Sequence, residues 1–188
     1  MTLNRCAWCG DDPLYISYHD HEWGVPVHDE TKHFEFLLLE SAQAGLSWIT
    51  ILRKRENYRL AFDGFDPEKI ARYDDAKIAD LLQNPGIIRN KRKIASAINN
   101  AQKFLDVRHE FGSFDQFIWQ YVDGRPIVNH FSELSDIPVT TALSDTISRD
   151  LKNRGFNFVG STIIYAHLQA IGIVNDHLIS CFRHAELS

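Results

Sequence analysis

Four side chains of the types that bind zinc lie near the two ends of the chain. Cys6 and His19 are 13 residues apart, and His177 and Cys181 are four residues apart. On one helical turn the second pair would project from the same face, as two ligands of one ion must. Two thiolates and two imidazoles would complete a closed tetrahedral zinc site, so the ion would be structural. Such a site would clip the N-terminal segment to the C-terminal one.

The same spacings can also arise without a four-ligand zinc site. A chain with nine histidines and three cysteines produces some of them by chance. Cys6 and Cys9 also form a Cys-x-x-Cys pair, which could serve a different zinc site or a redox pair. An odd number of cysteines fits a disulfide framework poorly. From the residues alone, these alternatives stay open.

A second group consists of aromatic residues around one acid in the first 48 positions. Its members are Trp8, Tyr15, Tyr18, Trp23, Glu40 and Trp48. Aromatic faces attract cations and stack on bases, and a carboxylate accepts hydrogen bonds from an exocyclic amine. The group could therefore hold a cationic adenine, which alkylation of the base produces. An ordinary aromatic core with a solvated glutamate at a helix edge is the alternative.

A third group is the basic segment that follows Asn84-Pro85-Gly86. Arg89, Lys91, Arg92 and Lys93 place four cations within residues 89 to 93. A glycine-bearing turn that leads into a helix exposes backbone N–H groups, which bind an anion such as phosphate with the help of the helix dipole. The alternative is a tight turn between two helices with a solvated basic start.

The elements that must position these groups are predicted to be helices. Helical periodicity runs through most of the chain and strand alternation is hard to find, so we predict an all-α fold. Asp66-Pro67-Glu68 predicts a short helix that turns Ile70 and Tyr73 inward. A second short helix is predicted from Asp75 to about Gln83.

The longest predicted helix follows the basic turn. Its apolar face consists of Ile94, Ala97, Ile98, Ala101 and Leu105. Ser113 and Gln116 predict a capping box at the start of a later helix, and Gly155 and Gly172 are expected to end two more. The predicted order is therefore a helix, a tight turn and a second helix. This order places the basic segment at the N-terminus of the second helix.

Composition limits the class of protein. With 188 residues, 44% of them hydrophobic, the chain is expected to form one globular domain or two lobes that share a core. The formal net charge of -5 argues against non-specific coating of nucleic acid but is compatible with a local basic patch. We find no apolar run of about 18 residues and no apolar signal segment, so we expect a cytoplasmic protein without a membrane partner.

These residues together resemble the 3-methyladenine DNA glycosylase I family, a branch of the helix-hairpin-helix glycosylases. The resemblance extends over nearly the whole chain. Besides Cys6 and Trp8, the segments that carry it are Asp12–Ile16, Tyr18–Pro26, Gln43–Trp48, Leu151–Gly160 and Val174–His177.

The resemblance implies roles for particular residues. The structural zinc ligands of the family match Cys6, His19, His177 and Cys181, which leaves Cys9 outside the site. Its base pocket matches Glu40, Tyr18 and Trp48, lined by Trp8, Tyr15 and Trp23. Its hairpin matches Pro85–Lys93, so the expected DNA contacts are Gly86, Ile88, Arg89, Lys91 and Lys93. Apart from the resemblance, the place of the loop Ala44-Gly45-Leu46 beside Glu40 and Trp48 predicts that Leu46 is a wedge in the vacated base stack.

The implied protein is a monomer with one structural zinc ion. It would form a single domain over residues 1–188 with two lobes. One lobe would span about residues 40–110 with the hairpin, and the N- and C-terminal segments would form the other, joined by zinc. When on DNA, the protein would be associated with the nucleoid.

The implied activity is excision of N3-methyladenine from duplex DNA by base flipping, the first step of base excision repair. Alkylation at N3 leaves the base positively charged, so its glycosidic bond is weak and no strong general acid is required. We expect Glu40 to hydrogen-bond the adenine edge, Tyr18 and Trp48 to stack on the base, and water to attack the sugar.

The sequence departs from the expected family pattern at His167 and Leu168, where an aromatic residue and a Met are expected. The catalytic Asp that many hairpin glycosylases carry after the hairpin helix has no persuasive counterpart, since Asp106 and Asp115 are poor candidates. The competing functions are an inert binder of damaged DNA, a zinc hydrolase and a zinc-stabilised interaction module.

Overall fold

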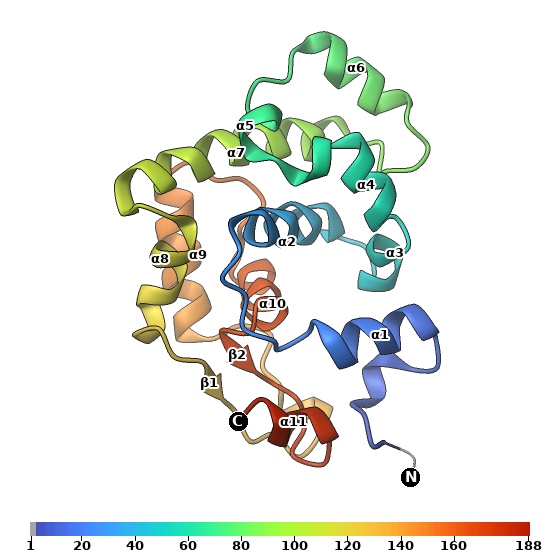
Figure 1. The fold of residues 1–188 in the computed structure, drawn as a ribbon, viewed down its shortest axis with the longest axis vertical. Coiled ribbons are helices and arrows are strands. Elements are labelled where there is room, and N and C mark those ends of the chain that lie inside the picture. The colour runs from blue at the N-terminus through green and yellow to red at the C-terminus, as the bar shows by residue number, and fades with distance from the viewer. Residues whose placement is uncertain (1–2) are drawn as a thin grey trace.

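The computed structural model describes residues 3–188 and is mostly helical (Figure 1). The α-helices are α1 (Pro13–His21), α2 (Glu30–Gln43), α3 (Trp48–Leu52), α4 (Arg55–Ala61), α5 (Pro67–Ile70), α6 (Asp75–Gln83), α7 (Lys91–Phe111), α8 (Phe114–Trp119), α9 (Ala142–Asn153), α10 (Ser161–Ala170) and α11 (Phe182–Glu186). Short 3-10 helices are η1 (Ala7–Cys9), η2 (Asp63–Phe65), η3 (Gln120–Val122) and η4 (Leu134–Asp136). Within the described residues, no helix is long and apolar enough to cross a membrane.

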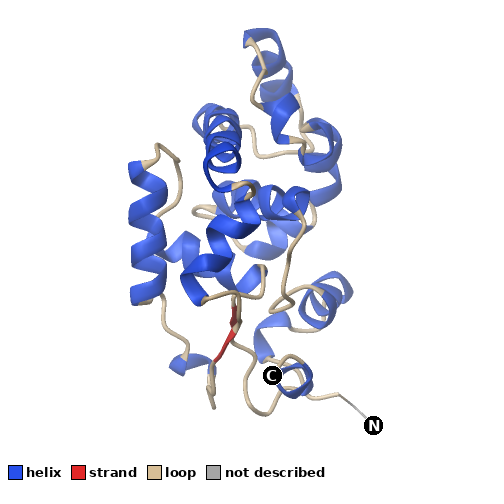
Figure 2. Cartoon of the chain, turned by 60° about the vertical axis from the view of Figure 1, so that its left-hand side comes forward, coloured by secondary structure: helices blue, strands red, loops and turns tan. Residues whose placement is uncertain are grey.

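The prediction of an all-α fold needs one correction. Strands β1 (Ile127–Val128) and β2 (Val174–Asn175) pair in parallel and join the segment before α9 to the C-terminal segment (Figure 2). Strands of two residues are too short for a period-two pattern, so sequence periodicity could not reveal them.

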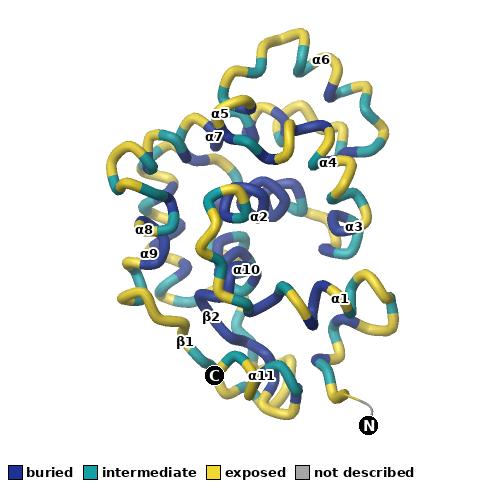
Figure 3. Tube along the Cα trace, in the orientation of Figure 1, coloured by how far each residue is buried: buried dark blue, intermediate teal, exposed yellow. Residues whose placement is uncertain are grey.

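Helix α2 lies at the centre of the molecule. It contacts α3, α7, α8 and α10, and every residue from His33 to Ala42 is buried (Figure 3). A helix that other helices surround buries all of its faces, whereas a surface helix buries one stripe. The position of α2 therefore places two of its three acids, Glu35 and Glu40, in the core.

The predicted helix starts in the segment before the basic turn are confirmed. The Asp66 carboxylate accepts the backbone N–H groups at the start of α5, and Ile70 is fully buried. Tyr73 is only partly buried, and its hydroxyl donates to the carboxylate of Asp63. Helix α6 begins at Asp75 as expected, although the capping side chain is that of Asp74.

The apolar face of α7 is rotated slightly from the predicted one. Its buried side includes Phe104 and Val107, whereas Ile98 and Leu105 are only half-buried. Phe104 on this side stacks on Phe114 of α8 with 4.5 Å between ring centroids. Sequence periodicity alone does not show which helices α7 will pack against.

Helix ends agree with the predicted signals in most places. Ser113 Oγ accepts the N–H of Gln116, which is one half of the predicted capping box. Gly155 and Gly172 follow α9 and α10 with φ of +90° and +70°. A Cβ on Gly172 would lie 2.3 Å from the carbonyl carbon of Val25, so glycine is required there.

Candidate functional site

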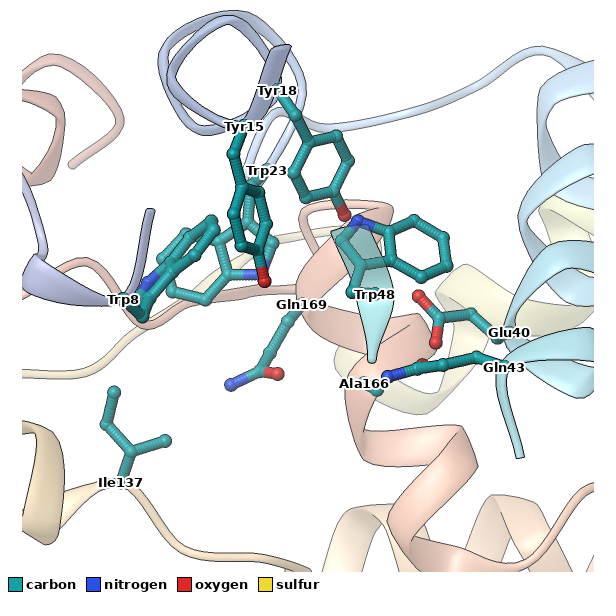
Figure 4. A pocket seen from close by; sticks show the side chains of 10 residues that line it. All are labelled: Trp8, Tyr15, Tyr18, Trp23, Glu40, Gln43, Trp48, Ile137, Ala166 and Gln169. Carbon is teal, nitrogen blue, oxygen red and sulfur yellow. The ribbon is translucent and has the colours of Figure 1, made fainter. Parts of the chain in front are cut away.

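An open pocket of about 230 Å³ lies among α1, α2, α3 and α10 (Figure 4). Its walls are formed by Trp8, Tyr15, Tyr18, Trp23, Glu40, Gln43, Trp48, Ile137, Ala166 and Gln169. The aromatic residues and the glutamate that the sequence singled out therefore lie around one cavity. The sequence did not single out the other four lining residues, because their types carry no chemical signature.

Local structure in the first helix directs the aromatic rings. The Asp12 carboxylate accepts the N–H groups that open α1, and Pro13 starts the helix with its fixed φ. Tyr15 and Tyr18 then face the pocket, while Trp8 lies edge-on to Tyr15 at 5.0 Å and to Trp23 at 4.9 Å between ring centroids. The rings form a rigid aromatic wall.

The opposite wall comes from α2 and α3. Trp48 is the first residue of α3, and its ring centroid lies 5.5 Å from that of Tyr18. The carboxyl group of Glu40 lies beside the Trp48 ring and close to Gln43 (Figure 4). A planar heterocycle could be held between these aromatic faces and the carboxyl group.

Glu40 is a buried acid without a partner. Its side chain is 3% exposed, and its Oε2 atom has no hydrogen-bond partner among the described residues. Burial raises its pKa from the usual 4.5 to about 8. Glu35 on the same helix is also buried but forms ion pairs with Arg55 and Arg59, both at 2.7 Å. The contrast marks Glu40 as a group kept for a ligand.

Two further polar groups of the pocket complement this acid. The indole Nε1 of Trp48 is buried and also lacks a partner among residues 3–188. Burial, and then the nearby charge of Glu40, raises the pKa of Tyr18 well above its usual value, so its hydroxyl stays a neutral donor. The pocket thus combines donors, one ionisable acceptor and aromatic faces, a combination suited to a cationic heterocycle.

The four predicted zinc ligands come together in a buried cluster. The ligand atoms of Cys6, His19, His177 and Cys181 all lie within 4.8 Å of one another, and the cluster could hold a metal ion. Cys181 Sγ lies 3.5 Å from ring nitrogens of both histidines, and Cys6 Sγ lies 3.7 Å from His177 Nδ1. A tetrahedral zinc ion with its usual bond lengths requires sulfur-to-nitrogen distances of about 3.5 Å.

The remaining ring nitrogens have the partners that orient metal ligands. His19 Nδ1 lies 2.7 Å from the Asp20 carboxylate, and His177 Nε2 lies 3.0 Å from the carbonyl oxygen of Trp23. Burial would raise the pKa of Asp20, but hydrogen bonds from Arg5 and His19 lower it, so the carboxylate stays charged.

The route by which the C-terminal pair reaches the cluster differs from the prediction. His177 and Cys181 lie in the loop between β2 and α11, not on one helical turn. Hydrogen bonds to neighbouring segments shape this loop; for example, the Ile179 N–H donates to the carbonyl of Phe131. Cys9 lies outside the cluster and its thiol donates to the carbonyl of Cys6.

The turn between α6 and α7 uses several of its polar groups internally. Asn84 Oδ1 accepts the N–H of Gly86 at 2.8 Å, and the Tyr58 hydroxyl accepts the N–H of Ile88 at 3.2 Å. A Cβ on Gly86 would lie 2.9 Å from that of Asn57, so the close approach of α4 requires a glycine. The turn is therefore preformed.

The exposed polar groups that could contact a ligand follow this turn directly, at the start of α7. Arg89 and Lys91 are exposed, and their backbone N–H groups have no acceptor within residues 3–188. Asn90 caps α7 by accepting the N–H groups of the next turn. Lys93 is different, because its ammonium group donates to two carbonyl oxygens of the protein. Leu46 is 39% exposed in the loop after α2.

The two departures from the expected pattern lie behind the pocket. Ala166 and Gln169 of α10 line the cavity, whereas His167 and Leu168 are buried and do not line it. Burial lowers the pKa of His167 to about 3, so its ring is neutral.

Asp106 and Asp115, considered above as counterparts of the catalytic Asp of hairpin glycosylases, also lie outside the pocket lining. Asp106 pairs with Lys103, and Asp115 accepts from His28 and His33. Their existing partners and positions are consistent with structural roles.

Known proteins share this fold over most of its extent. Residues 8–184 match the family model described as methyladenine glycosylase. DNA-3-methyladenine glycosylase 1 of Escherichia coli strain K12 is 49% identical over 179 residues, which are 95% of this chain and 96% of the relative. A crystal structure of 3-methyladenine DNA glycosylase I is 51% identical, with a TM-score of 0.93 over 95% of this chain and 98% of that one.

A variant of 3-methyladenine DNA glycosylase I in complex with 3-methyladenine is 39% identical to this chain. Its TM-score is 0.92, over 96% of this chain and 97% of the variant. The fold and the pocket define a helical protein that could enclose a flat, cationic heterocycle. The chain belongs to the methyladenine glycosylase family.

Proposed function

We propose that this protein is a monofunctional DNA glycosylase that hydrolyses the N-glycosidic bond of N3-methyladenine in alkylated duplex DNA. The reaction would be the first step of base excision repair. The observation that carries the proposal is the buried, unpartnered carboxyl group of Glu40 at the end of an aromatic pocket. Membership of the methyladenine glycosylase family supports the same reaction.

The pocket residues have distinct roles in this proposal. Tyr18 and Trp48 stack on the flipped base, and Trp8, Tyr15 and Trp23 complete the aromatic wall. The positive charge of the alkylated base favours the ionised form of Glu40, which then accepts a hydrogen bond from the adenine edge. Neutral adenine gains neither the cation-π attraction nor this charge pairing, so recognition of the cation selects the substrate. Water then attacks the sugar as the bond breaks.

The basic turn is the proposed grip on the DNA backbone, in the manner of a helix-hairpin-helix motif. The unpaired N–H groups of Arg89 and Lys91 lie at the N-terminus of α7, where the helix dipole favours a phosphate. Gly86 and Ile88 shape the turn through their internal hydrogen bonds. Leu46, exposed beside the pocket, is the proposed wedge that fills the vacated base stack.

We further propose that the Cys and His cluster binds one structural zinc ion. The donor set and its spacing fit tetrahedral zinc, and four protein ligands would leave no position for a reacting water. When bound, the ion would cross-link the N-terminal and C-terminal segments. Figure 1 shows α1 and α11, near the two ends of the described chain, on the side of the molecule opposite α5 and α6. This arrangement supports two lobes of one domain, and we expect the protein to act as a monomer.

The test is release of free base from methylated duplex DNA by the purified protein, identified by chromatography. We expect the wild type to release 3-methyladenine and Glu40→Gln, which keeps the shape of the side chain, to lose most of that activity. The matched control is Glu110→Gln, since Glu110 is an exposed acid paired with Arg154. No release from a folded, metal-loaded sample would instead favour a binder of damaged DNA, and full activity of Glu40→Gln would remove Glu40 from the mechanism.

A further inference from the structure

Lys93 is turned inward, unlike the other cations of the basic turn. Arg89, Lys91 and Arg92 are exposed, whereas the Lys93 Nζ atom donates to the carbonyl oxygens of two residues in another part of the chain. Both hydrogen bonds are 2.8 Å long. Burial also lowers the pKa of Lys93, as expected for an ammonium group that has left water.

The two acceptors are the carbonyl oxygens of Ala42 and Ala44, at the end of α2. The last carbonyls of a helix have no partner within the helix, and a cation there also complements the helix dipole. The loop that follows, residues 44–47, lies between Glu40 and Trp48 and carries the exposed Leu46. Lys93 therefore connects the first turn of α7 directly to the wall of the pocket.

A second lysine makes the opposite connection. Lys54, which follows α3, donates from Nζ to the carbonyl oxygens of Pro85 and Gly86 at 3.2 and 3.4 Å. Lys54 thus joins the end of α3 to the turn before α7, and Lys93 joins the start of α7 to the end of α2. In Figure 1 α7 lies above α2, in agreement with these contacts.

We propose that Lys93 is a positioning residue that holds the loop of residues 44–47 against the start of α7. The inference rests on the proposed function and deepens it. A flipped base reaches the pocket correctly only when the phosphate grip and the pocket keep a constant separation. A displacement of about 1 Å at a reacting centre can reduce a rate on the order of a hundredfold.

The experiment compares Lys93→Met with Lys93→Arg and with Lys103→Met. Lys103 is the matched control, because it lies on the same helix and its one ion-pair partner among residues 3–188 is Asp106. Excision of 3-methyladenine from a duplex oligonucleotide is measured under single-turnover conditions at saturating protein, beside the dissociation constant for that duplex. The midpoint of thermal unfolding of each variant is also measured.

We expect Lys93→Met to lower the saturated rate constant by about tenfold or more and to change the dissociation constant by less than about threefold. Lys93→Arg should retain most of the rate, since a guanidinium group can donate to the same carbonyls. Lys103→Met should match the wild type. A weaker dissociation constant with an unchanged saturated rate would show that Lys93 contacts phosphate, and would overturn the proposal.

Gly45→Ala provides a second variant in the same loop. Gly45 has φ of +79° and its Cβ would meet open space, so an alanine strains the loop backbone without a clash. The same rate loss in Gly45→Ala, less than additive with that of Lys93→Met, would support one shared loop geometry. If neither variant changes the saturated rate, the proposal is wrong. An inactive wild type would contradict the glycosylase function itself.

Discussion

Glu40 and Glu35 lie on the same buried helix, but only Glu35 has cationic partners. An ionised carboxylate that is buried without a partner is unfavourable in free energy. Burial therefore raises the pKa of Glu40 to about 8. The unliganded pocket is therefore close to neutral at physiological pH. A cationic base would then enter a site whose one acid ionises in response to it.

The raised pKa of Glu40 predicts how stability depends on pH. The unfolded chain loses this proton near pH 4.5 and the folded protein only near pH 8, so the folded state binds more protons between those values. Stability therefore falls as the pH rises from 4.5 to 8, by about 3 kcal/mol at pH 7 from this group alone.

Glu40→Gln removes that contribution. The variant should unfold at a higher temperature than the wild type at pH 8, and the difference should shrink towards pH 4.5. Thermal unfolding across this range measures the effect. A difference that does not depend on pH would contradict the raised pKa.

The same group predicts the pH profile of the reaction. Because kcat/KM reports ionisations of the free protein, and the carboxylate favours the cationic base, kcat/KM for a lesion in DNA should rise with pH. The expected rise is about tenfold per pH unit below pH 8, with a plateau above it. Glu40→Gln should have a flat profile in this range. A fall above pH 8 in the wild type would assign the active form to neutral Glu40.

At the scale of elements, each part of the site depends on how a helix begins or ends. Helix α1 begins with an Asp cap and directs two tyrosines, α2 ends at the loop before Trp48, and α7 begins at the basic turn. Helix ends carry unpaired backbone groups and changes of direction, so they are natural positions for ligand contacts.

Lys91, at the start of α7, is expected to contribute to the affinity for DNA. Lys91→Met should weaken binding to any duplex alike and reduce the slope of log affinity against log salt concentration by about one, since one phosphate contact is lost. Titrations at several salt concentrations give this slope, with Lys103→Met as the control. An unchanged slope would show that Lys91 does not contact phosphate.

Across the whole molecule, the Cys and His cluster joins segments that are far apart in the chain. Cys6 and His177 are 171 residues apart, and Trp23 contacts both the cluster and the pocket. With the proposed zinc ion bound, a cross-link over so long a loop would restrict the unfolded chain strongly. The ion would therefore link the stability of the molecule to the aromatic wall.

Removal of the proposed zinc ion should destabilise the protein without changing the chemistry. Metal analysis should find one zinc per chain, and Cys6→Ser should lower the unfolding temperature by several degrees, whereas Cys9→Ser should have a smaller effect. At a temperature where Cys6→Ser is folded, its saturated excision rate should stay near that of the wild type. A selective loss of that rate would support a catalytic metal instead.

Features that depend on neighbours in the chain could be predicted from the sequence alone. Asp66 and Ser113 start helices and Gly155 and Gly172 end them, because capping and positive φ involve only a few adjacent residues. Residue types also indicated the aromatic residues and the acid of the pocket and the members of the Cys and His cluster, and the family resemblance selected among the alternatives.

Burial and side-chain direction, in contrast, were set by tertiary contacts. These contacts buried Glu40 without a partner, turned Lys93 away from the other cations, and placed His177 and Cys181 on a loop instead of a helix. Each outcome depends on which helices surround α2 and on how α7 rotates against its neighbours. Such contacts join residues distant in the chain, so local periodicity and spacing carry no record of them.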